Sequence, residues 1–306
     1  MDTAELRAIV GEEHVQENVS LAGYTTFRIG GPADVLVQVG GEEQLEKVLA
    51  WCRESGRPWI LLGRGSNVLV DDAGFRGTVI LLDGTLAKIE VRGDQITAGA
   101  GASLARIART ALEHELTGME YAAGIPGTLG GAVYMNAGAY GGEIGRTVSS
   151  IRYLDREGIH EIGPEEAGFE YRSSRFMREN AIVLGAEMTL QPGDRQAIMD
   201  RMQELAEQRK SKQPLEYPSA GSMFKRPEGF FAGKLIQDAG LAGYSVGGAQ
   251  VSEKHCGFVI NRGNATAKDV RELVRQVADR VEQTFGVRLE PEVRYLSQEG
   301  LKPLLA

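Results

Sequence analysis

The stretch from Ala122 to Glu143 reads Ala-Ala-Gly-Ile-Pro-Gly-Thr-Leu-Gly-Gly-Ala-Val-Tyr-Met-Asn-Ala-Gly-Ala-Tyr-Gly-Gly-Glu, and seven of its 22 residues are glycine. Each glycine costs about 0.5–1 kcal/mol relative to alanine in regular structure, so this density calls for a reason. The stretch contains no serine and a single charge, which is atypical of a flexible linker. We predict a wall of backbone amides that faces a ligand, for which phosphate is the usual partner. A purely structural glycine-rich turn is the alternative.

Length and composition indicate an ordinary globular protein with two or three domains. The chain has 306 residues, of which 42% are hydrophobic and 25% are charged. Its net charge of −8 argues against a nucleic-acid partner, because phosphate backbones require a basic surface. No apolar run approaches the roughly 18 residues of a membrane span, and the first residues do not resemble a signal peptide.

Cysteine usage indicates a reducing compartment. Cys52 and Cys256 are the only two cysteines, and they fit neither a disulfide framework nor a metal-ligand spacing. We therefore expect a cytoplasmic protein without a metal site. Together with the composition, this favours a small-molecule substrate and no membrane or nucleic-acid partner. We also expect a monomer.

Hydrophobic periodicity predicts alternating strands and helices in the first half. One helix buries Leu45, Val48, Leu49 and Cys52 and stops at Gly56. A second helix begins at Ser103 as N-cap and ends near Gly118. The predicted strands are 35–39, 59–62, 78–82, 88–91, 95–98, 150–154, 159–162 and 182–190.

A break at Pro192-Gly193 predicts the domain boundary, with one domain at 1–193 and another at 194–306. The second domain is expected to open with a helix that buries Ile198, Met202 and Leu205. A basic loop over 209–218 should follow that helix. Thr266 and Asp269 are placed as N-cap and N3 of a helix that closes at Gly286, and 292–296 is predicted as the final strand.

A second glycine-rich loop follows a predicted strand at Gly63-Arg64-Gly65-Ser66-Asn67-Val68. It is no dinucleotide fingerprint, because Val68 stands where the third glycine belongs, and no Gly-Lys-Ser/Thr of a Walker A loop occurs. Successive amides with the Ser66 and Asn67 side chains can hold a pyrophosphate, whereas a plain β-turn is the alternative. Two such surfaces suit a long ligand with two phosphates, such as a dinucleotide.

Six blocks resemble the bacterial UDP-N-acetylenolpyruvoylglucosamine reductase (MurB) family, in the family's order from about Asn18 to Leu296. They are Thr25-Thr26-Phe27-Arg28-Ile29-Gly30-Gly31-Pro32-Ala33, Gly63-Arg64-Gly65-Ser66-Asn67, Gly124-Ile125-Pro126-Gly127-Thr128-Leu129-Gly130-Gly131, Tyr171-Arg172-Ser173-Ser174-Arg175-Phe176, Ala220-Gly221-Ser222-Met223-Phe224-Lys225-Arg226-Pro227 and Glu290-Pro291-Glu292-Val293-Arg294. The compact second half resembles the shorter form of the family, which lacks an extra substrate-covering loop.

The resemblance implies an α+β fold. An FAD-binding domain of the vanillyl-alcohol-oxidase (PCMH) type would consist of two α/β subdomains, about 1–75 and 76–193, followed by a smaller α+β substrate domain. None of the four histidines lies in a glycine-rich loop, so the FAD is expected to be noncovalent. The implied cofactor-binding residues are Gly63, Arg64, Gly65, Ser66, Asn67, Val68, Gly124, Ile125, Pro126, Gly127, Thr128, Gly130, Gly131, Asn136, Ala137, Gly138 and Ile182.

The implied activity is that of an NADPH-driven oxidoreductase of peptidoglycan precursor synthesis. It reduces the enolpyruvyl ether of UDP-N-acetylglucosamine to UDP-N-acetylmuramate. By the resemblance, Arg172 would hold the enolate charge, Ser222 would donate the proton, and Glu292 would polarise the same carboxyl group. Without the resemblance, a surface ion pair, a turn and a solvated strand end would account for these three residues.

A basic cluster around Arg209, Lys212 and Lys225 predicts a docking point for the UDP pyrophosphate, which Tyr171 can also contact. A solvated basic loop is the alternative. Two rival functions remain from the sequence: another FAD oxidoreductase on the same fold, and a flavin-binding sensor without catalysis.

Overall fold

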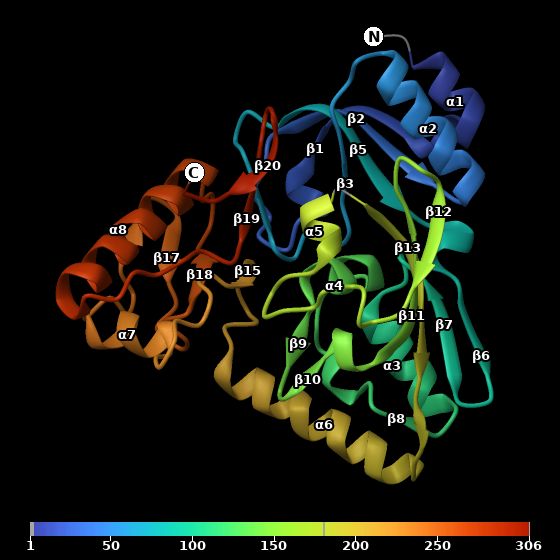
Figure 1. Cartoon of the computed structure of the whole chain (residues 1–306). Coiled ribbons are helices and arrows are strands. Elements are labelled where there is room, and N and C mark those ends of the chain that lie inside the picture. The colour runs from blue at the N-terminus through green and yellow to red at the C-terminus, as the bar shows by residue number, and fades with distance from the viewer. Residues whose placement is uncertain (1–2, 180, 306) are drawn as a thin grey trace.

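The three largest β-sheets and the hydrophobic cores packed against them organise the chain (Figure 1). The computed structural model describes residues 3–179 and 181–305. Helices and strands are mixed throughout, so the expected α+β class is confirmed.

The first sheet has the strand order β1-β2-β5-β3. The strand β2 is parallel to β5, which is parallel to β3, whereas β1 is antiparallel to β2. Along β2, Val35, Val37 and Val39 pack under the helices α1 and α2, and Leu36 packs into a core on the other face. The bounds are β1 (Val15–Ser20), β2 (Pro32–Val39), β3 (Trp59–Leu61), β5 (Phe75–Leu82), α1 (Ala4–Val10) and α2 (Glu42–Glu54).

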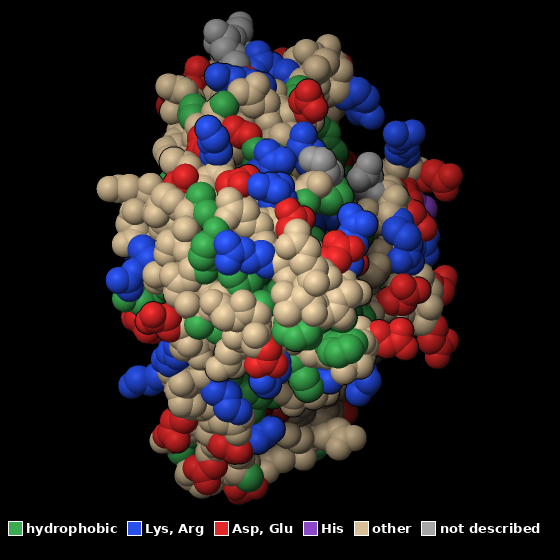
Figure 2. Space-filling view, turned by 90° about the vertical axis from the view of Figure 1, so that its left-hand side faces the viewer, with side chains coloured by type: hydrophobic (Ala, Val, Ile, Leu, Met, Phe, Trp, Pro, Cys, Tyr) green, Lys and Arg blue, Asp and Glu red, His purple; other side chains and the backbone are tan. Residues whose placement is uncertain are grey.

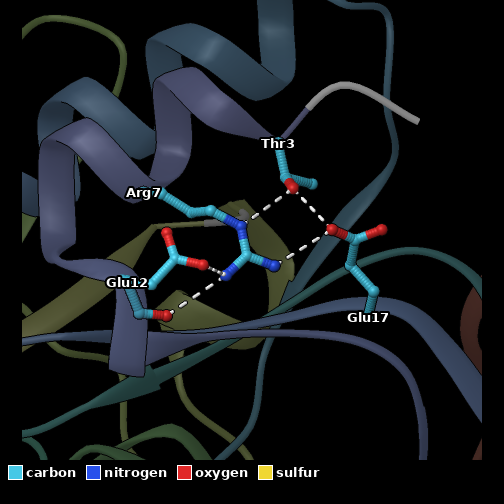
Figure 3. Close-up of polar contacts among 4 residues, drawn as sticks. All are labelled: Thr3, Arg7, Glu12 and Glu17. Atoms are coloured by element: carbon cyan, nitrogen blue, oxygen red, sulfur yellow. Dashed lines mark hydrogen bonds and ion pairs between the residues drawn. The ribbon is translucent and has the colours of Figure 1, made fainter.

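A polar network fastens α1 to the start of the sheet (Figure 3). The Arg7 guanidinium donates to Glu12 Oε1 at 2.5 Å and to Glu17 Oε1 at 3.1 Å. Thr3 Oγ1 donates to the same Glu17 oxygen at 2.6 Å. These bonds lower the pKa of the Glu17 carboxyl, and they join the first helix to β1.

The second sheet is antiparallel, with the strand order β12-β11-β13-β7-β6. The helix α3 starts as predicted, with Ser103 Oγ accepting from Arg106 N, but it ends at Glu113, before Gly118. The strand β5 pairs in the first sheet as far as its last residue, so the chain changes sheets after Leu82. The bounds are β6 (Ile89–Arg92), β7 (Gln95–Gly99), α3 (Leu104–Glu113), α4 (Leu129–Met135), β11 (Val148–Leu154), β12 (Ile159–Ile162) and β13 (Ile182–Thr189).

The helix α6 (Arg195–Lys212) corrects one expectation. Arg209 and Lys212 were expected in a loop, but they form the last turn of this helix. The basic side chains lie where the helix dipole favours positive charge, so they stabilise the helix end. Figure 1 shows α6 running along the underside of the molecule toward the C-terminal part.

The C-terminal part packs the helices α7 (Ala232–Asp238) and α8 (Ala267–Phe285) against a four-stranded sheet of order β15-β18-β17-β16. The expected capping box at Thr266 and Asp269 is confirmed, and Gly286 ends α8 in the left-handed region. The strands are β15 (Ser219–Ser222), β16 (Ser245–Val246), β17 (Ala249–Val251) and β18 (Phe258–Asn261).

A separate three-stranded sheet of order β20-β19-β4 joins strands from the two ends of the chain. The strand β4 (Val68–Val70) runs parallel to β19 (Arg294–Ser297), and β20 (Gly300–Pro303) pairs with β19 on its other side. The final strand was expected at 292–296, and β20 was not predicted. Phe27, Ile29 and Leu69 are buried in the core of the C-terminal part.

The remaining elements are short. They are η1 (Glu12–His14), η2 (Leu21–Tyr24), η3 (Gly84–Ala87), β8 (Leu116–Thr117), η4 (Glu120–Ala122), β9 (Gly138–Ala139), β10 (Gly142–Glu143), η5 (Ile144–Arg146), α5 (Arg175–Glu179) and β14 (Gln191–Pro192).

The surface carries both signs of charge. Figure 2 shows acidic and basic side chains interspersed over one face, with hydrophobic side chains in small groups between them. Among the described residues, no helix combines the length and hydropathy that a membrane crossing requires.

Candidate functional site

Arg172, Ser222 and Glu292 line one cavity of about 380 Å³, although 120 positions separate the first from the last. Arg172 comes from the turn before α5, Ser222 ends β15, and Glu292 lies just before β19. The structure therefore brings together the three side chains that the sequence analysis selected as catalytic.

Arg172 sits in a two-residue turn with an unusual backbone. Its φ of +56° is in the left-handed region, which a side chain with a Cβ rarely adopts. The guanidinium Nε lies 2.9 Å from Glu292 Oε1, and Nη2 donates to the Gly138 carbonyl at 3.2 Å. Both partners are mostly buried, with 23% and 13% of their side chains exposed. This planar cation is thus held at a fixed position in the cavity wall.

Hydrogen bonds at both the amide and the carbonyl of Glu292 fix its backbone. Its amide donates to the Met223 carbonyl at 2.9 Å, and its own carbonyl accepts from Asn67 Nδ2 at 3.3 Å. Burial raises the pKa of the Glu292 carboxyl, and the charges of Arg172 and Lys225 oppose that rise without cancelling it. A raised pKa favours the protonated carboxyl, whose O–H can donate a hydrogen bond.

Ser222 is exposed to the cavity because β15 is irregular. The register with β18 shifts between Ser219 and Ser222, and Gly221 between them has a φ of +77°. Such a bulge re-aims the following side chain. Met223 next to Ser222 is fully buried, which fixes the backbone beside the hydroxyl.

The two glycine-rich loops meet. A Cβ at Gly63 would lie 2.6 Å from Oγ1 of Thr128, so the first loop touches the start of α4 at this point. Within the described residues, the amides of residues 63–67 donate no hydrogen bond to the protein. Successive free amides of this kind form a nest for an anion, so the loop fits the pyrophosphate of FAD.

Some of these glycines also have a reason inside the protein. A Cβ at Gly65 would lie 2.3 Å from the Tyr24 carbonyl, and one at Gly130 would lie 2.9 Å from Ala100 Cβ. At Gly127 nothing is nearer than 3.7 Å, and at Gly131 nothing is nearer than 3.5 Å. The predicted wall therefore mixes glycines required by packing with glycines where a Cβ would make only ordinary contacts with the protein.

The other cofactor candidates divide into three groups. Asn136, Ala137 and Gly138 follow the C-terminal end of α4, beside the turn that carries Arg172. Ile182 begins β13 and is buried in the core under the first sheet, with no printed contact to either glycine-rich loop. Arg64, Ser66, Val68, Gly124, Ile125 and Pro126 lie in the two loops or at their ends.

The substrate candidates are dispersed. Tyr171 lines the cavity, and its hydroxyl accepts from Arg226 N at 3.3 Å. Lys225 pairs with Glu290 at 2.5 Å. Arg209 donates to the Gly124 carbonyl and lies against the Tyr140 ring, beside the second glycine-rich loop. Lys212 is exposed at the end of α6.

Several cavity residues were missed from the sequence. Arg226, Lys234 and Lys254 also line it, so cations outnumber the carboxylates of Glu253 and Glu292 there. Another missed cavity residue is His255, whose Nδ1 accepts from Gly257 N and whose pKa is lowered by burial. The chain distance between these residues conceals them, because only folding puts α7 and the β17–β18 connection against Ser222.

Comparison with known proteins agrees with this geometry. Residues 33–163 match an FAD binding domain, and residues 213–296 match the C-terminal domain of UDP-N-acetylenolpyruvoylglucosamine reductase. The enzyme of that name from Lachnoclostridium phytofermentans is 50% identical over 300 residues, covering 96% of this chain and 97% of its own. The Clostridium novyi enzyme is 47% identical over 297 residues, covering 97% and 96%.

A solved structure agrees as well. The crystal structure of UDP-N-acetylenolpyruvylglucosamine reductase (MurB) from Thermus caldophilus superimposes with a TM-score of 0.79 at 38% identity. It covers 90% of this chain and 97% of its own. With near-complete coverage at this identity, the chain belongs to the UDP-N-acetylenolpyruvoylglucosamine reductase family.

Proposed function

We propose that the chain reduces the enolpyruvyl ether of UDP-N-acetylglucosamine to the lactyl ether of UDP-N-acetylmuramate, for peptidoglycan precursor synthesis. The observation that supports this most is the convergence of Arg172, Ser222 and Glu292 on one cavity with an excess of cations. The substrate carries a pyrophosphate and a carboxylate, and a cationic cavity suits both.

FAD is the cofactor that the two glycine-rich loops would hold, and it would supply the hydride that it receives from NADPH. The amides of residues 63–67 would bind its pyrophosphate, with the side-chain-free backbone at Gly127 and Gly131 as the second surface. Within the described residues no side chain of these loops is a histidine, which suits noncovalent binding.

Arg172 and Glu292 would act on the substrate carboxylate. When the vinyl carbon gains a hydride, negative charge spreads over the adjacent carbon and its carboxylate as an enolate. A fixed guanidinium stabilises that charge, and one well-placed donor of this type contributes about 3–4 kcal/mol. Glu292, whose pKa burial raises, would contribute a second hydrogen bond in its protonated form.

Ser222 would complete the reaction by donating its hydroxyl proton to the carbanionic carbon. The bulge at Gly221 exposes this hydroxyl to the cavity. An enolate carbon is a strong base, and this compensates for the weak acidity of a serine hydroxyl. The product then carries one hydride and one proton more than the substrate.

Tyr171, Arg209, Lys212 and Lys225 remain our proposed contacts for the substrate phosphates. We also propose a cofactor domain at 1–193 and a substrate domain at 194–306, and a monomeric enzyme in the cytoplasm.

The purified protein tests this function by its colour. Under anaerobic conditions NADPH should bleach the yellow flavin, and the enolpyruvyl sugar nucleotide should restore the colour with formation of UDP-N-acetylmuramate. Rapid reoxidation by oxygen and none by the sugar nucleotide would indicate an oxidase instead. A protein that NADPH does not bleach would indicate a flavin-binding protein without this activity.

A further inference from the structure

The turn that carries Arg172 has a strained backbone and needs stabilising contacts from outside the turn. Glu170 and Ser173 exchange backbone hydrogen bonds at 3.0 and 3.1 Å, with Tyr171 and Arg172 between them. The left-handed backbone of Arg172 costs about 1–2 kcal/mol, so the surroundings must oppose relaxation of the turn.

Asn136 supplies the contact that opposes it. The residue ends α4 with a φ of +44°, and only 3% of it is exposed. Its Nδ2 donates to the Glu170 carbonyl at 3.0 Å, and its Oδ1 accepts from Gly145 N at 3.0 Å. Both ends of the amide are therefore engaged, one of them with the first residue of the turn.

The space around this amide is shaped for it. A Cβ at Gly145 would lie 3.0 Å from Asn136 Oδ1 and 2.8 Å from the Phe169 ring. Glycine at 145 thus permits the close approach. Glycine is the usual residue at a left-handed helix end, so the asparagine at position 136 indicates that its side chain has a use there.

Two further bonds tie the same segments together. The fully buried Ser174 donates from Oγ to the Tyr134 carbonyl at 2.8 Å, and Arg172 Nη2 donates to the Gly138 carbonyl. Three side-chain bonds therefore connect residues 134–138, at the end of α4, with residues 170–174.

We propose that Asn136 is a positioning residue for Arg172, which sets the guanidinium in the cavity by holding the turn at Glu170. The inference rests on the role proposed above for Arg172. The sequence predicted that Asn136 contacts the cofactor. Because both ends of its amide are engaged within the protein, we assign this side chain to positioning in place of that contact.

The test is Asn136→Asp in the full-length flavoprotein, with flavin reduction and reoxidation followed separately by stopped flow. The aspartate has the same size and still accepts from Gly145 N, but it cannot donate to the Glu170 carbonyl when ionised. Flavin content and reduction by NADPH should stay as in the wild type. Reoxidation by the enolpyruvyl sugar nucleotide should slow about 10- to 100-fold, in kcat rather than KM, because misplacement by about 1 Å has effects of this size.

Asn136→Gly is the second variant, since glycine suits the left-handed backbone and loses both side-chain bonds; it should show the same split. Asn264→Asp is the matched control, because Asn264 is also left-handed, with a φ of +55°, but is exposed before α8. The control should reoxidise at the wild-type rate.

Wild-type reoxidation in both Asn136 variants would overturn the inference. So would an equal loss of flavin binding and reduction by NADPH, which would mark a cofactor or general structural residue. Arg172→Lys, measured alongside, separates the two claims. If it keeps the wild-type rate, the role of Arg172 in the proposed function is wrong; if it alone is slow, only the role of Asn136 is wrong.

Discussion

At the scale of single residues, the Arg172–Glu292 pair combines two opposing effects on one carboxyl group. Burial disfavours the charged form of Glu292, whereas the Arg172 cation at 2.9 Å favours it. The net direction is a raised pKa, so burial has the larger effect. A substrate carboxylate that engages Arg172 would weaken the pair further and favour the protonated form.

Glu292 should therefore make stability depend on pH in a definite direction. A raised folded-state pKa means that the folded protein binds more protons, so the contribution of Glu292 is present below its ordinary pKa of 4.5 and declines as pH rises through the higher folded value. The free energy of unfolding of the wild type, relative to Glu292→Gln, should fall as pH rises above 4.5. Urea denaturation of both proteins over this range measures it, and an increasing difference would show that the Arg172 ion pair dominates instead.

At the scale of elements, a side chain at Gly130 in α4 would clash with the protein, whereas one at Gly127 in the preceding loop would not. A valine at Gly130 would press against Ala100, and overpacking of this kind costs about 1–3 kcal/mol. A Cβ at Gly127 would meet the protein only at 3.7 Å, an ordinary contact, and we propose that the cofactor lies beside this residue. Gly127→Val should leave the unfolding temperature of the flavin-free protein unchanged but lower its flavin content.

Gly130→Val is the matched comparison, and it should lower the unfolding temperature even without flavin. Visible absorbance per protein and thermal unfolding by circular dichroism measure the two effects. Normal flavin content in Gly127→Val would mean that the backbone at Gly127 does not face FAD.

The N-terminus of α8 depends on a residue from the other end of the chain. Asp72 accepts from Ala267 N at 2.7 Å and from Lys268 N at 3.0 Å, in addition to the local capping box. Asp72→Ala should lower the free energy of unfolding by about 1–2 kcal/mol, as the loss of a helix cap does. Asp94→Ala, at an exposed aspartate between β6 and β7, is the control in urea denaturation. Equal stability of the two variants would show that the cap from Asp72 contributes nothing.

Local signals in the sequence were sufficient for elements with strong caps and clear periodicity. Ser103, Thr266 and Gly286 marked helix ends correctly. The sequence predicts a loop for the basic run at 209–212 because Pro214 and Pro218 follow it. In the structure α6 continues through Lys212, where the basic side chains interact favourably with the helix dipole. The edge strand β20 was missed because it has few β-branched residues and depends on pairing with β19.

At the scale of the whole molecule, the hydrophobic core of the C-terminal part is completed by residues from the N-terminal part. Phe27, Ile29 and Leu69 from the N-terminal part are buried within it, and β4 pairs with β19. A fragment of residues 194–306 would expose the face that these side chains cover. We expect such a fragment to lack a folded core, visible as poor amide dispersion in NMR spectra. A well-dispersed spectrum would show that the C-terminal domain folds by itself.

In the candidate site too, some features can be predicted from the sequence, whereas others arise only when the chain folds. The blocks that carry Arg172, Ser222 and Glu292 are visible in the sequence, because each has a local pattern. The meeting of the glycine-rich loops at Gly63 and Thr128 is not visible, since packing between sheets sets it. The cations at Lys234 and Lys254 in the cavity escaped notice for the same reason.

The central claim, a cavity in which Ser222 protonates the substrate, is tested most directly by stopped-flow measurement of both half-reactions in Ser222→Ala. Reduction of the flavin by NADPH should proceed as in the wild type, because no proton from Ser222 enters that step. Reoxidation by the enolpyruvyl sugar nucleotide should slow about 10²- to 10⁴-fold, the range for loss of a general acid, and Ser222→Cys should recover part of the rate. If Ser222→Ala instead impairs reduction by NADPH and spares reoxidation, Ser222 lines the nicotinamide site and the proposed mechanism is wrong.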